Sequence, residues 1–502
     1  MLALLFVPTY PTVMRLTLAS LLFAFATAAA AAPADDVWMS VLLDGRKVGD
    51  MHLTRNARGG RVVTSQSLNV ELDRAGVKVG LASSETDTET SDGKPLAFES
   101  RTAISGIASV LKGTIRPDGD VDVVSEVGGA KQTRTVPWPA GALLAEGLRL
   151  ADARAGLKPG THFSERAYQA ESLEAVDVES TVGPAERIDL PDGARTLTRV
   201  DQQIHLPGAG TTTTVWVDAE QDVHKMTMSL MGYELTMLAC SKACATAKNQ
   251  SADILVHAMV EAPAALTPDE LAHGVNLRVR ATQNGGTPLT FATTDEQSVT
   301  KTADGVELHI APLAEGAKPQ REERPAARDS APNDWLQSQA PEIQKLARQG
   351  IGDATSARER MERLETFVRG YIRNKDLNVG YASALEVAKH PEGDCTEHAV
   401  LLAALGRALG IPTRVVDGLA YTDQYAGAQH VFVPHAWAQA YVDGRWQSFD
   451  AALHGFDAGH IALSFGDGDP WRFFAGFDTL GRMRVEAVAA ASPPLPADTA
   501  AH

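Results

Sequence analysis

The residues best suited to chemistry lie between Gly393 and Asp450. Cys395 comes first, His435 follows, and Asp450 closes the stretch. A thiolate can attack a carbonyl carbon, an imidazole can take and return the thiol proton, and a carboxylate can orient the imidazole. These three residue types in this order predict a thiol acyl-transfer site.

Cys395 is predicted to lie in the first turn of a buried helix. Asp394 is a favourable N-cap residue, and Glu397 completes a capping-box pattern. Residues 400–409 are apolar on nearly all sides, and Gly410 provides the stop. Backbone N–H groups and the helix dipole favour an anion at this end, so the position favours a thiolate.

His435 and Asp450 are predicted to lie on one face of a β-hairpin. Strand-like residues flank Asp443-Gly444, which is a strong signal for a two-residue turn. In that register Asp450 lies opposite Trp437, and His435 is its diagonal neighbour, at roughly 7–8 Å between Cβ atoms. The imidazole and the carboxylate can meet across this gap.

These motifs together resemble the transglutaminase-like superfamily over roughly residues 335–480, and exported bacterial members in particular. The matching motifs are Gly393-Asp394-Cys395-x-x-His398-Ala399, Gly410-Ile411-Pro412-x-Arg414, His435-Ala436-Trp437, and Trp446 with Asp450. The resemblance implies a papain-like α+β domain with Cys395 as nucleophile, His435 as base and Asp450 as orienting residue.

Two positions depart from the family pattern and bear on substrate preference more than on chemistry. Gln439 stands where a glutamate is common, and Ala451-Ala452 follows the aspartate where a proline often comes first.

The reaction expected of such a site is acyl transfer without a cofactor. The thiolate attacks an amide carbonyl, the amine leaves, and water or another amine resolves the thioester. The backbone N–H of Cys395 is the expected oxyanion donor. Tyr381, His398 and Trp437 are further candidates for substrate or oxyanion contacts.

Two other functions stay open on the sequence alone. One is a zinc site made from scattered ligands, Cys395, His398, His430 and His435, although no second cysteine pair accompanies them. The other is a non-catalytic binding or scaffolding protein that keeps the fold. A one-residue slip of the hairpin would separate His435 from Asp450 and make His430 with Asp417 or Asp423 the pair to examine.

The composition is that of an ordinary globular protein, with 502 residues, 44% hydrophobic and 22% charged. The length suffices for about three domains. The net charge of −17 argues against a nucleic-acid or anionic-membrane partner.

Residues 1–32 have the pattern of a signal peptide. Arg15 precedes an apolar run from Leu16 to Phe25, and alanines follow. The run is shorter than the ~20 residues of a spanning helix, so we expect no membrane span after cleavage. The predicted location is periplasmic or secreted, and the expected partner is a protein or peptide substrate in the cell envelope.

The three cysteines fit an oxidising compartment. Cys240 and Cys244 are close in sequence, so a local disulfide is the default between them. Cys395 is then a free thiol.

The predicted fold class is α+β, with a large N-terminal β-rich region before the catalytic domain. Short strands and turn signals such as Asp44-Gly45 over residues 33–250 predict an antiparallel sheet, a sandwich or a partly closed barrel. One helix is expected within 140–155.

Residues 251–312 form a second β stretch, either a module or the end of the first domain, with candidate strands at 254–260, 275–281, 289–292 and 306–310. Charged residues and prolines predict a linker over 313–332. Helical periodicity then opens the catalytic domain at 333–490, with a last helix at 471–480. Residues 491–502 are expected to be a disordered tail.

Overall fold

The structure is a computed structural model. It describes residues 36–74, 77–104, 107–206, 209–230, 233–254, 258–282, 289–313, 323–375, 381–469 and 480–490. The predicted signal peptide, the C-terminal tail and nearly all of the helix predicted at 471–480 lie outside these residues.

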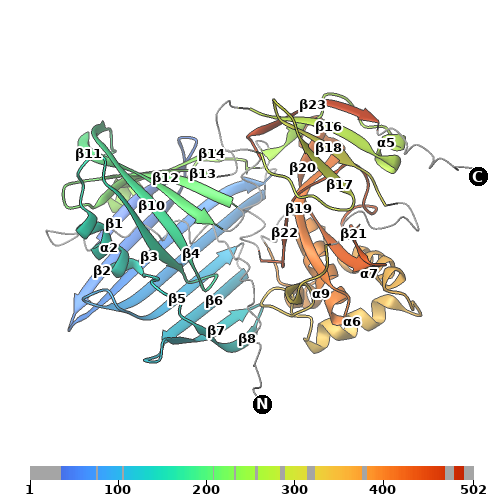
Figure 1. Ribbon diagram of the computed structural model, residues 1–502, viewed down its shortest axis with the longest axis horizontal. Helices are drawn as coiled ribbons and strands as arrows, with labels where there is room; N and C mark the ends of the chain where they lie inside the picture. Colours follow the sequence, from blue (N-terminus) through green and yellow to red (C-terminus); the bar gives the residue numbers. More distant parts are fainter. Residues whose placement is uncertain are drawn as a thin grey trace, which may run out of the picture.

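A continuous 14-stranded antiparallel sheet forms the N-terminal part of the chain, as predicted from its strands and turns (Figure 1). Consecutive strands are neighbours except β8 and β9, which are the two ends of the order, and β1 also pairs with β14, so the order runs from β8 through β1 and β14 to β9. The first eight strands are β1 (Asp36–Leu43), β2 (Arg46–Arg58), β3 (Arg61–Arg74), β4 (Val77–Thr90), β5 (Pro95–Ile104), β6 (Ile107–Ile115), β7 (Asp120–Val127) and β8 (Ala130–Pro137). The other six are β9 (His162–Gln169), β10 (Glu174–Ile188), β11 (Arg195–Leu206), β12 (Ala209–Val217), β13 (Val223–Leu230) and β14 (Tyr233–Cys240).

The helix α2 (Ala145–Ala155) packs against β3, β4 and β9. Glu89 of β4 accepts hydrogen bonds from the backbone N–H groups of Glu146 and Gly147 in the first turn of this helix. Burial and the neighbouring Asp87 raise the pKa of Glu89 to about 8, although the two N–H groups favour its ionised form. A carboxylate here satisfies donors that the helix leaves unpaired, so Glu89 fixes α2 to the sheet.

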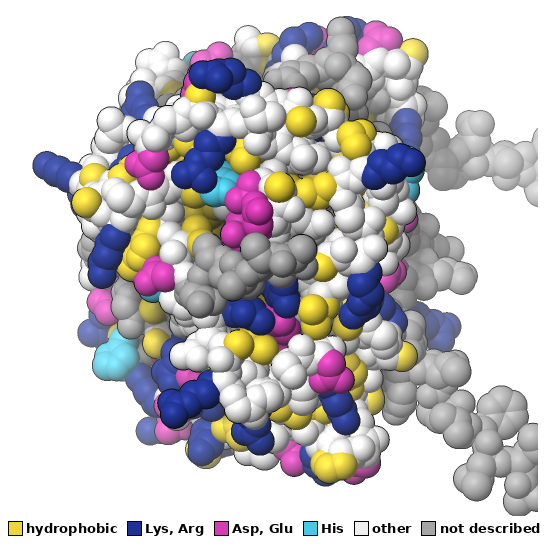
Figure 2. Space-filling view, turned by 90° about the vertical axis from the view of Figure 1, so that its left-hand side faces the viewer, with side chains coloured by type: hydrophobic (Ala, Val, Ile, Leu, Met, Phe, Trp, Pro, Cys, Tyr) yellow, Lys and Arg dark blue, Asp and Glu magenta, His cyan; other side chains and the backbone are white. Residues whose placement is uncertain are grey.

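A disulfide joins Cys240, at the end of β14, to Cys244 in the short helix α3 (Lys242–Ala245). Figure 2 looks onto the N-terminal part of the molecule and shows basic and acidic side chains interspersed over that face. This face therefore carries mixed charge.

The C-terminal domain is built on a second sheet with the order β15-β20-β19-β22, in which β21 also pairs with β20. Helix α9 packs on β19 and β20, and α6, α7 and α8 pack around α9. The elements are α6 (Pro341–Ile351), α7 (Ala357–Tyr371), α8 (Ala384–Lys389), α9 (Cys395–Ala408), β15 (Val260–Glu261), β19 (Thr413–Tyr425), β20 (Ala428–Val442), β21 (Arg445–Phe449) and β22 (His460–Gly466).

A third sheet joins the second β stretch to the end of the described chain. Its order is β17-β18-β16-β23, so the stretch is not a continuation of the N-terminal sheet. The elements are α5 (Pro268–His273), β16 (Val275–Ala281), β17 (Gln297–Lys301), β18 (Val306–Ile310) and β23 (Met483–Ala490). The strands predicted at 254–260 and 289–292 were wrong. In the first range residues 255–257 lie outside the described residues, and of the described ones only Val260 lies in a strand, while residues 289–292 have no regular structure.

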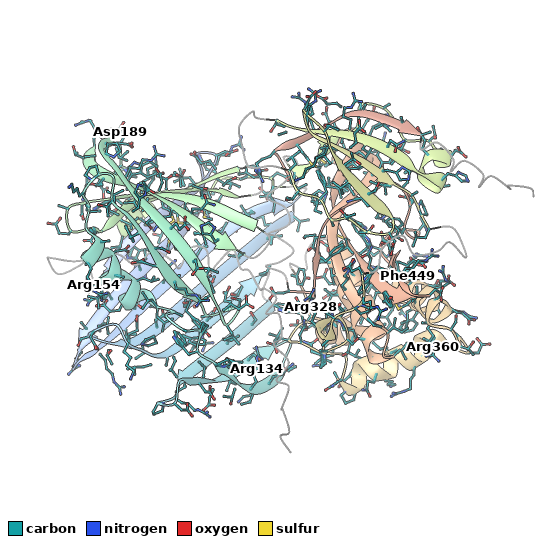
Figure 3. The ribbon with its side chains drawn as sticks, in the orientation of Figure 1. Arg134, Arg154, Asp189, Arg328, Arg360 and Phe449 are labelled. Atoms are coloured by element: carbon teal, nitrogen blue, oxygen red, sulfur yellow. A yellow bond between two sulfur atoms is a disulfide. The ribbon has the colours of Figure 1, made fainter. Side chains whose placement is uncertain are left out.

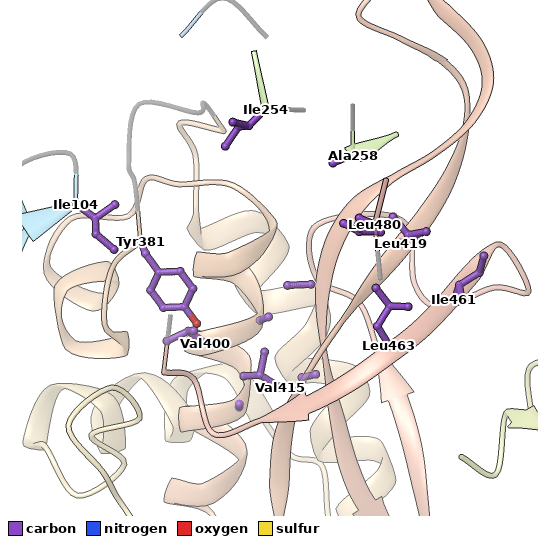
Figure 4. Close-up of a cluster of buried hydrophobic side chains, with 14 of the residues drawn as sticks. Ile104, Ile254, Ala258, Tyr381, Val400, Val415, Leu419, Ile461, Leu463 and Leu480 are labelled. Carbon is purple, nitrogen blue, oxygen red and sulfur yellow. The ribbon is translucent and has the colours of Figure 1, made fainter. Parts of the chain in front are cut away.

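Hydrophobic packing continues from the N-terminal sheet into the C-terminal domain. One cluster includes Met39 and Val41 of β1 as well as Val400 of α9. Figure 4 shows part of it, with Val400 near Val415 of β19. Polar contacts add to this junction, because Ser125 and Arg134 both bond to Asp334. Figure 3 places Arg134 on the side of the N-terminal sheet that is nearer to the C-terminal domain.

The described end of the predicted linker is held to the C-terminal domain. Glu323 accepts a hydrogen bond from Arg414 at 2.7 Å, and the short 3-10 helix Ala327–Asp329 follows. Among the described residues, none of the helices combines the length and the apolar character that a membrane crossing requires.

Candidate active site

Cys395 is the first residue of α9, and local hydrogen bonds fix this helix end. The Asp394 side chain accepts the Thr396 N–H at 2.9 Å, and Glu397 accepts the Asp394 N–H at 2.9 Å, which is the predicted capping box. Glu397 also accepts the N–H of Ala382 at 2.8 Å, so it ties α9 to the segment before α8.

Gly393 has a positive φ of 139°, and a Cβ there would overlap the Glu397 side chain. The close approach of the cysteine loop to Glu397 therefore requires glycine.

The hairpin adopts the predicted register. Val442 pairs with Arg445 and Ala438 with Phe449, with Asp443-Gly444 as the turn. In this register the Nε2 atom of His435 lies 2.7 Å from Oδ2 of Asp450. Trp437 lies beside them, with its ring stacked at 6.2 Å from that of His435.

Asp450 is buried, and four groups bond to its carboxylate. Oδ1 accepts the backbone N–H groups of Ala452 and Leu453, at 2.8 and 3.1 Å. Oδ2 lies 2.7 Å from His435 Nε2 and 3.1 Å from Nε2 of a second histidine, His460. Burial alone would raise the pKa of Asp450, but the charge and hydrogen bonds of the two imidazoles hold it well below its usual range.

Helix α7 holds the backbone of Asp450 from both sides. Glu365 accepts the Asp450 N–H at 2.7 Å, and Arg369 donates to the Asp450 carbonyl at 3.1 Å. Burial raises the pKa of Glu365 to about 7, although the hydrogen bond from the Asp450 N–H lowers it. Glu365 and Arg369, which the sequence analysis did not single out, thus fix the position of Asp450.

His460 is the residue that sequence reasoning missed. It begins β22 and pairs with Ala420 of β19, which brings its ring beside Asp450. The only signal was a histidine before the apolar run Ile461-Ala462-Leu463. That pattern is equally typical of a histidine packed in a core.

The atoms of His435, Asp450 and His460 lie within 4.8 Å of one another, as metal ligands also do. Their shortest separation is 2.7 Å, whereas two ligands of a tetrahedral zinc ion lie ~3.3 Å apart. The spacing is therefore that of hydrogen bonds. Within the described residues, no group with metal-ligand spacing contains the other predicted zinc ligands, Cys395, His398 and His430.

Gln439, where the family commonly has a glutamate, joins a buried polar network. Its side-chain oxygen accepts from Arg414 Nε at 3.0 Å, and its amide donates to Glu296 at 3.2 Å. Glu296 comes from the loop before β17 and also accepts the Ser448 N–H at 2.9 Å. Burial raises the pKa of Glu296 to about 7. The carboxylate that Gln439 lacks is thus supplied by a different segment of the chain.

The remaining predicted residues have different surroundings. Tyr381 is buried, and its hydroxyl donates to the Gly468 carbonyl at 3.0 Å, so the predicted oxyanion donor is engaged elsewhere. His398 is buried and donates from Nδ1 to the Asp394 carbonyl at 2.6 Å. Burial lowers the pKa of His398, which favours the neutral ring. His430 bonds to the Tyr421 hydroxyl at 3.0 Å.

The comparisons with known proteins concern both parts of the chain. A family model described as the transglutaminase-like superfamily matches residues 344–451. A solved candidate cysteine protease from Cytophaga hutchinsonii is 14% identical, with a TM-score of 0.27, and the match covers 45% of this chain and 88% of that one. A solved β-barrel-like protein with a domain of unknown function, from Brucella abortus, is 13% identical with a TM-score of 0.32, over 41% of this chain and 95% of that one.

A solved candidate protease from Parabacteroides distasonis is 13% identical, with a TM-score of 0.20, over 79% of this chain and 70% of that one. A search of curated proteins found no match. The match at residues 344–451 covers α7, the cysteine helix and the hairpin up to Asp450 and Ala451, and this segment of the chain is similar to the transglutaminase-like superfamily.

Proposed function

We propose that this chain is an exported cysteine enzyme that transfers acyl groups from amide or peptide bonds, with Cys395 as nucleophile, His435 as base and Asp450 as orienting residue. The observation that carries the proposal is the hydrogen bond between His435 and Asp450. His435 lies on β20, the strand against which the Cys395 helix packs. Nucleophile, base and orienting group on adjoining elements are the requirement for nucleophilic catalysis.

The hydrogen bond defines how the imidazole works. Asp450 is ionised, so Nε2 of His435 carries the proton of this bond. Nδ1 is then the nitrogen that takes the thiol proton from Cys395 and delivers it to the departing amine. Asp450 stabilises the imidazolium that exists between these two transfers.

The thiolate attacks the amide carbonyl, and the carbonyl electrons move to oxygen. The backbone N–H of Cys395, at the N-terminus of α9, is the proposed donor to that oxyanion. Collapse of the tetrahedral intermediate breaks the C–N bond and leaves a thioester, which water hydrolyses or an amine aminolyses. The protein or peptide substrate is proposed to lie in the cell envelope.

Export is part of the same proposal. Its support is the signal-like segment at 1–32 together with the Cys240–Cys244 disulfide, because such bridges persist in oxidising compartments.

A thiol-reactive probe tests the enzyme against a non-catalytic protein of the same fold. Under non-reducing conditions the Cys240–Cys244 bridge blocks two of the three cysteines, so iodoacetamide reports on Cys395 alone. We expect fast labelling at pH 6 in the wild type and loss of most of it in His435→Ala. Equal labelling in both proteins would favour the non-catalytic alternative.

A further inference from the structure

The structure gives the candidate triad a fourth member. A triad needs one imidazole on its carboxylate, but Oδ2 of Asp450 bonds to the Nε2 atoms of both His435 and His460. The two rings lie at 62° to each other with their centroids 5.7 Å apart. His460 thus interacts with the same oxygen that orients the base.

The other side of His460 also meets a carboxylate. Its Nδ1 lies 3.0 Å from Oδ1 of Asp457 and 3.1 Å from the Asp457 carbonyl. The imidazole is fully enclosed, whereas the Asp457 side chain is 42% exposed. The Asp457 N–H also approaches Nδ1, at 3.3 Å, but both Asp457 oxygens lie closer to it. Hydrogen bonds from the ring to both carboxylates, Asp450 and Asp457, are made only when both ring nitrogens carry protons.

Three aromatic or imidazole rings enclose His460. Trp437 meets it edge-on at 5.2 Å between centroids, Phe456 lies at 4.9 Å, and His435 completes the enclosure. These rings restrict the imidazole to one orientation, so the bond to Asp450 is held in place by packing.

The titratable and charged groups that face this pair come from four segments. Asp457 lies on the loop before β22, and Glu296 reaches His460 electrostatically from the loop before β17. Glu365 and Arg369 approach Asp450 from α7, and His398 interacts with it from α9. Among the groups that bond to the Asp450 carboxylate, His460 is the one that can add a full positive charge without taking part in proton transfer.

We propose that His460 is a positioning residue, a buried imidazolium that locks the Asp450 carboxylate and offsets part of its negative charge, and so sets the pH range over which Cys395 reacts as a thiolate beside His435. This inference rests on the proposed function. Burial would lower the pKa of His460, but its bonds to Asp450 and Asp457 raise it to about 10, which keeps the ring charged in the working range.

The physical consequence has a definite sign. The Asp450 carboxylate attracts positive charge at both rings that share its Oδ2 atom, and a cation at one ring weakens the attraction at the other. Removing the charge of His460 should therefore strengthen the thiolate–imidazolium pair of Cys395 and His435 and extend its reactivity to higher pH. A histidine that only fills the core would lower stability or rate but would leave the pH dependence where it was.

The test is the pH profile of Cys395 alkylation by iodoacetate in the full-length oxidised chain. This anion is attracted by a thiolate–imidazolium pair, so its rate falls again at the pH where the imidazolium is lost. His460→Gln keeps an amide that can donate to Asp450 and removes the charge. The alkaline limb of its profile should move up by about one to two pH units for charges about 6 Å apart. The matched control is His224→Gln, which removes an imidazole paired with Asp218 at 2.8 Å in the N-terminal sheet and should leave the profile unchanged.

A second variant covers the case in which His460→Gln does not fold. Asp457→Asn removes one of the two acids that keep His460 charged, at a more exposed position, and should shift the limb in the same direction by less. An unshifted limb in the folded His460→Gln protein, even with a lower rate, would overturn the inference. If that protein does not fold, an unshifted alkaline limb in the Asp457→Asn protein would overturn the inference.

The same experiment separates the two proposals. A wild-type profile that rises only near pH 8.5, as for an isolated thiol, would refute the proposed function itself. A wild-type profile with a reactive thiolate at lower pH, unaffected by either variant, would remove only the role of His460.

Discussion

Asp450→Asn is the substitution for which the structure makes the most detailed prediction. The carboxylate accepts two backbone N–H groups on Oδ1 and two imidazoles on Oδ2. An amide has one accepting oxygen, so its NH2 group must face donors on one of the two sides. Either the turn after β21 or the imidazole pair loses its acceptor.

The magnitude follows from what is left unpaired. Removing one partner of a buried, hydrogen-bonded charge pair costs about 3–5 kcal/mol, and we expect that loss in the free energy of unfolding at pH 7. The rate should fall by up to about 10⁴, because the wrong tautomer of His435 is then favoured while thiol and base remain. The loss should be smaller than in Cys395→Ala or His435→Ala.

The pH dependence of the stability loss supplies a second check. The pKa of Asp450 is depressed in the folded chain, so its contribution is complete above the unfolded value of about 4 and is lost as the pH falls. Urea unfolding of the wild type and Asp450→Asn should therefore give free energies that differ most at neutral pH and approach each other below about pH 4.

Asp443→Asn is the matched control in the same hairpin. Asp443 is an exposed turn residue with φ of 52°, paired with Arg358, and asparagine accepts this conformation. It should change stability by less than about 0.5 kcal/mol. A rate of Asp450→Asn within tenfold of wild type, or a stability equal to that of Asp443→Asn, would refute the reasoning.

Four further predictions concern other parts of the chain. Cys395→Ala should keep the fold, by circular dichroism, and reduce turnover of a peptide amide by on the order of 10⁶, and a loss under tenfold would exclude Cys395 as nucleophile. Non-reducing mass spectrometry should find Cys240 bridged to Cys244. Removing this disulfide, which closes only a short loop, should lower the free energy of unfolding by about 2 kcal/mol. Gly418→Ala would drive a Cβ into the Ile461 carbonyl and the Trp437 ring, which should cost about 1–3 kcal/mol in urea unfolding; unchanged stability would contradict that contact. Because the pKa of His460 is raised to about 10, its stabilisation should be complete below about pH 6.5 and be lost as the pH rises toward 10, and wild type and His460→Gln should converge in that window.

The sequence was sufficient where the controlling interactions are local. Asp394 and Glu397, three residues apart along the chain, form the capping box that determines where the cysteine helix starts. The Asp443-Gly444 turn fixed the register that brings His435 to Asp450, because a two-residue turn determines every pair that follows. Alternating strands and turn signals likewise predicted the large antiparallel sheet.

Only the tertiary structure decided the contacts that span long sequence separations. His460 reaches Asp450 because β22 pairs with β19, and Glu296 reaches Gln439 from a segment more than a hundred residues earlier. Tyr381 has the residue type of an oxyanion donor, but packing directs its hydroxyl to the Gly468 carbonyl.

The physical reason is a difference in range. Caps, turns and strand alternation depend on residues a few positions apart, so their energies can be read from the order of residue types. The partner of a buried polar group depends on which strands and helices pack together, and many partners satisfy the same local pattern. The sequence alone therefore predicted the cysteine helix and the hairpin that joins His435 to Asp450, and the packing of β22, α7 and the third sheet decided what surrounds Asp450.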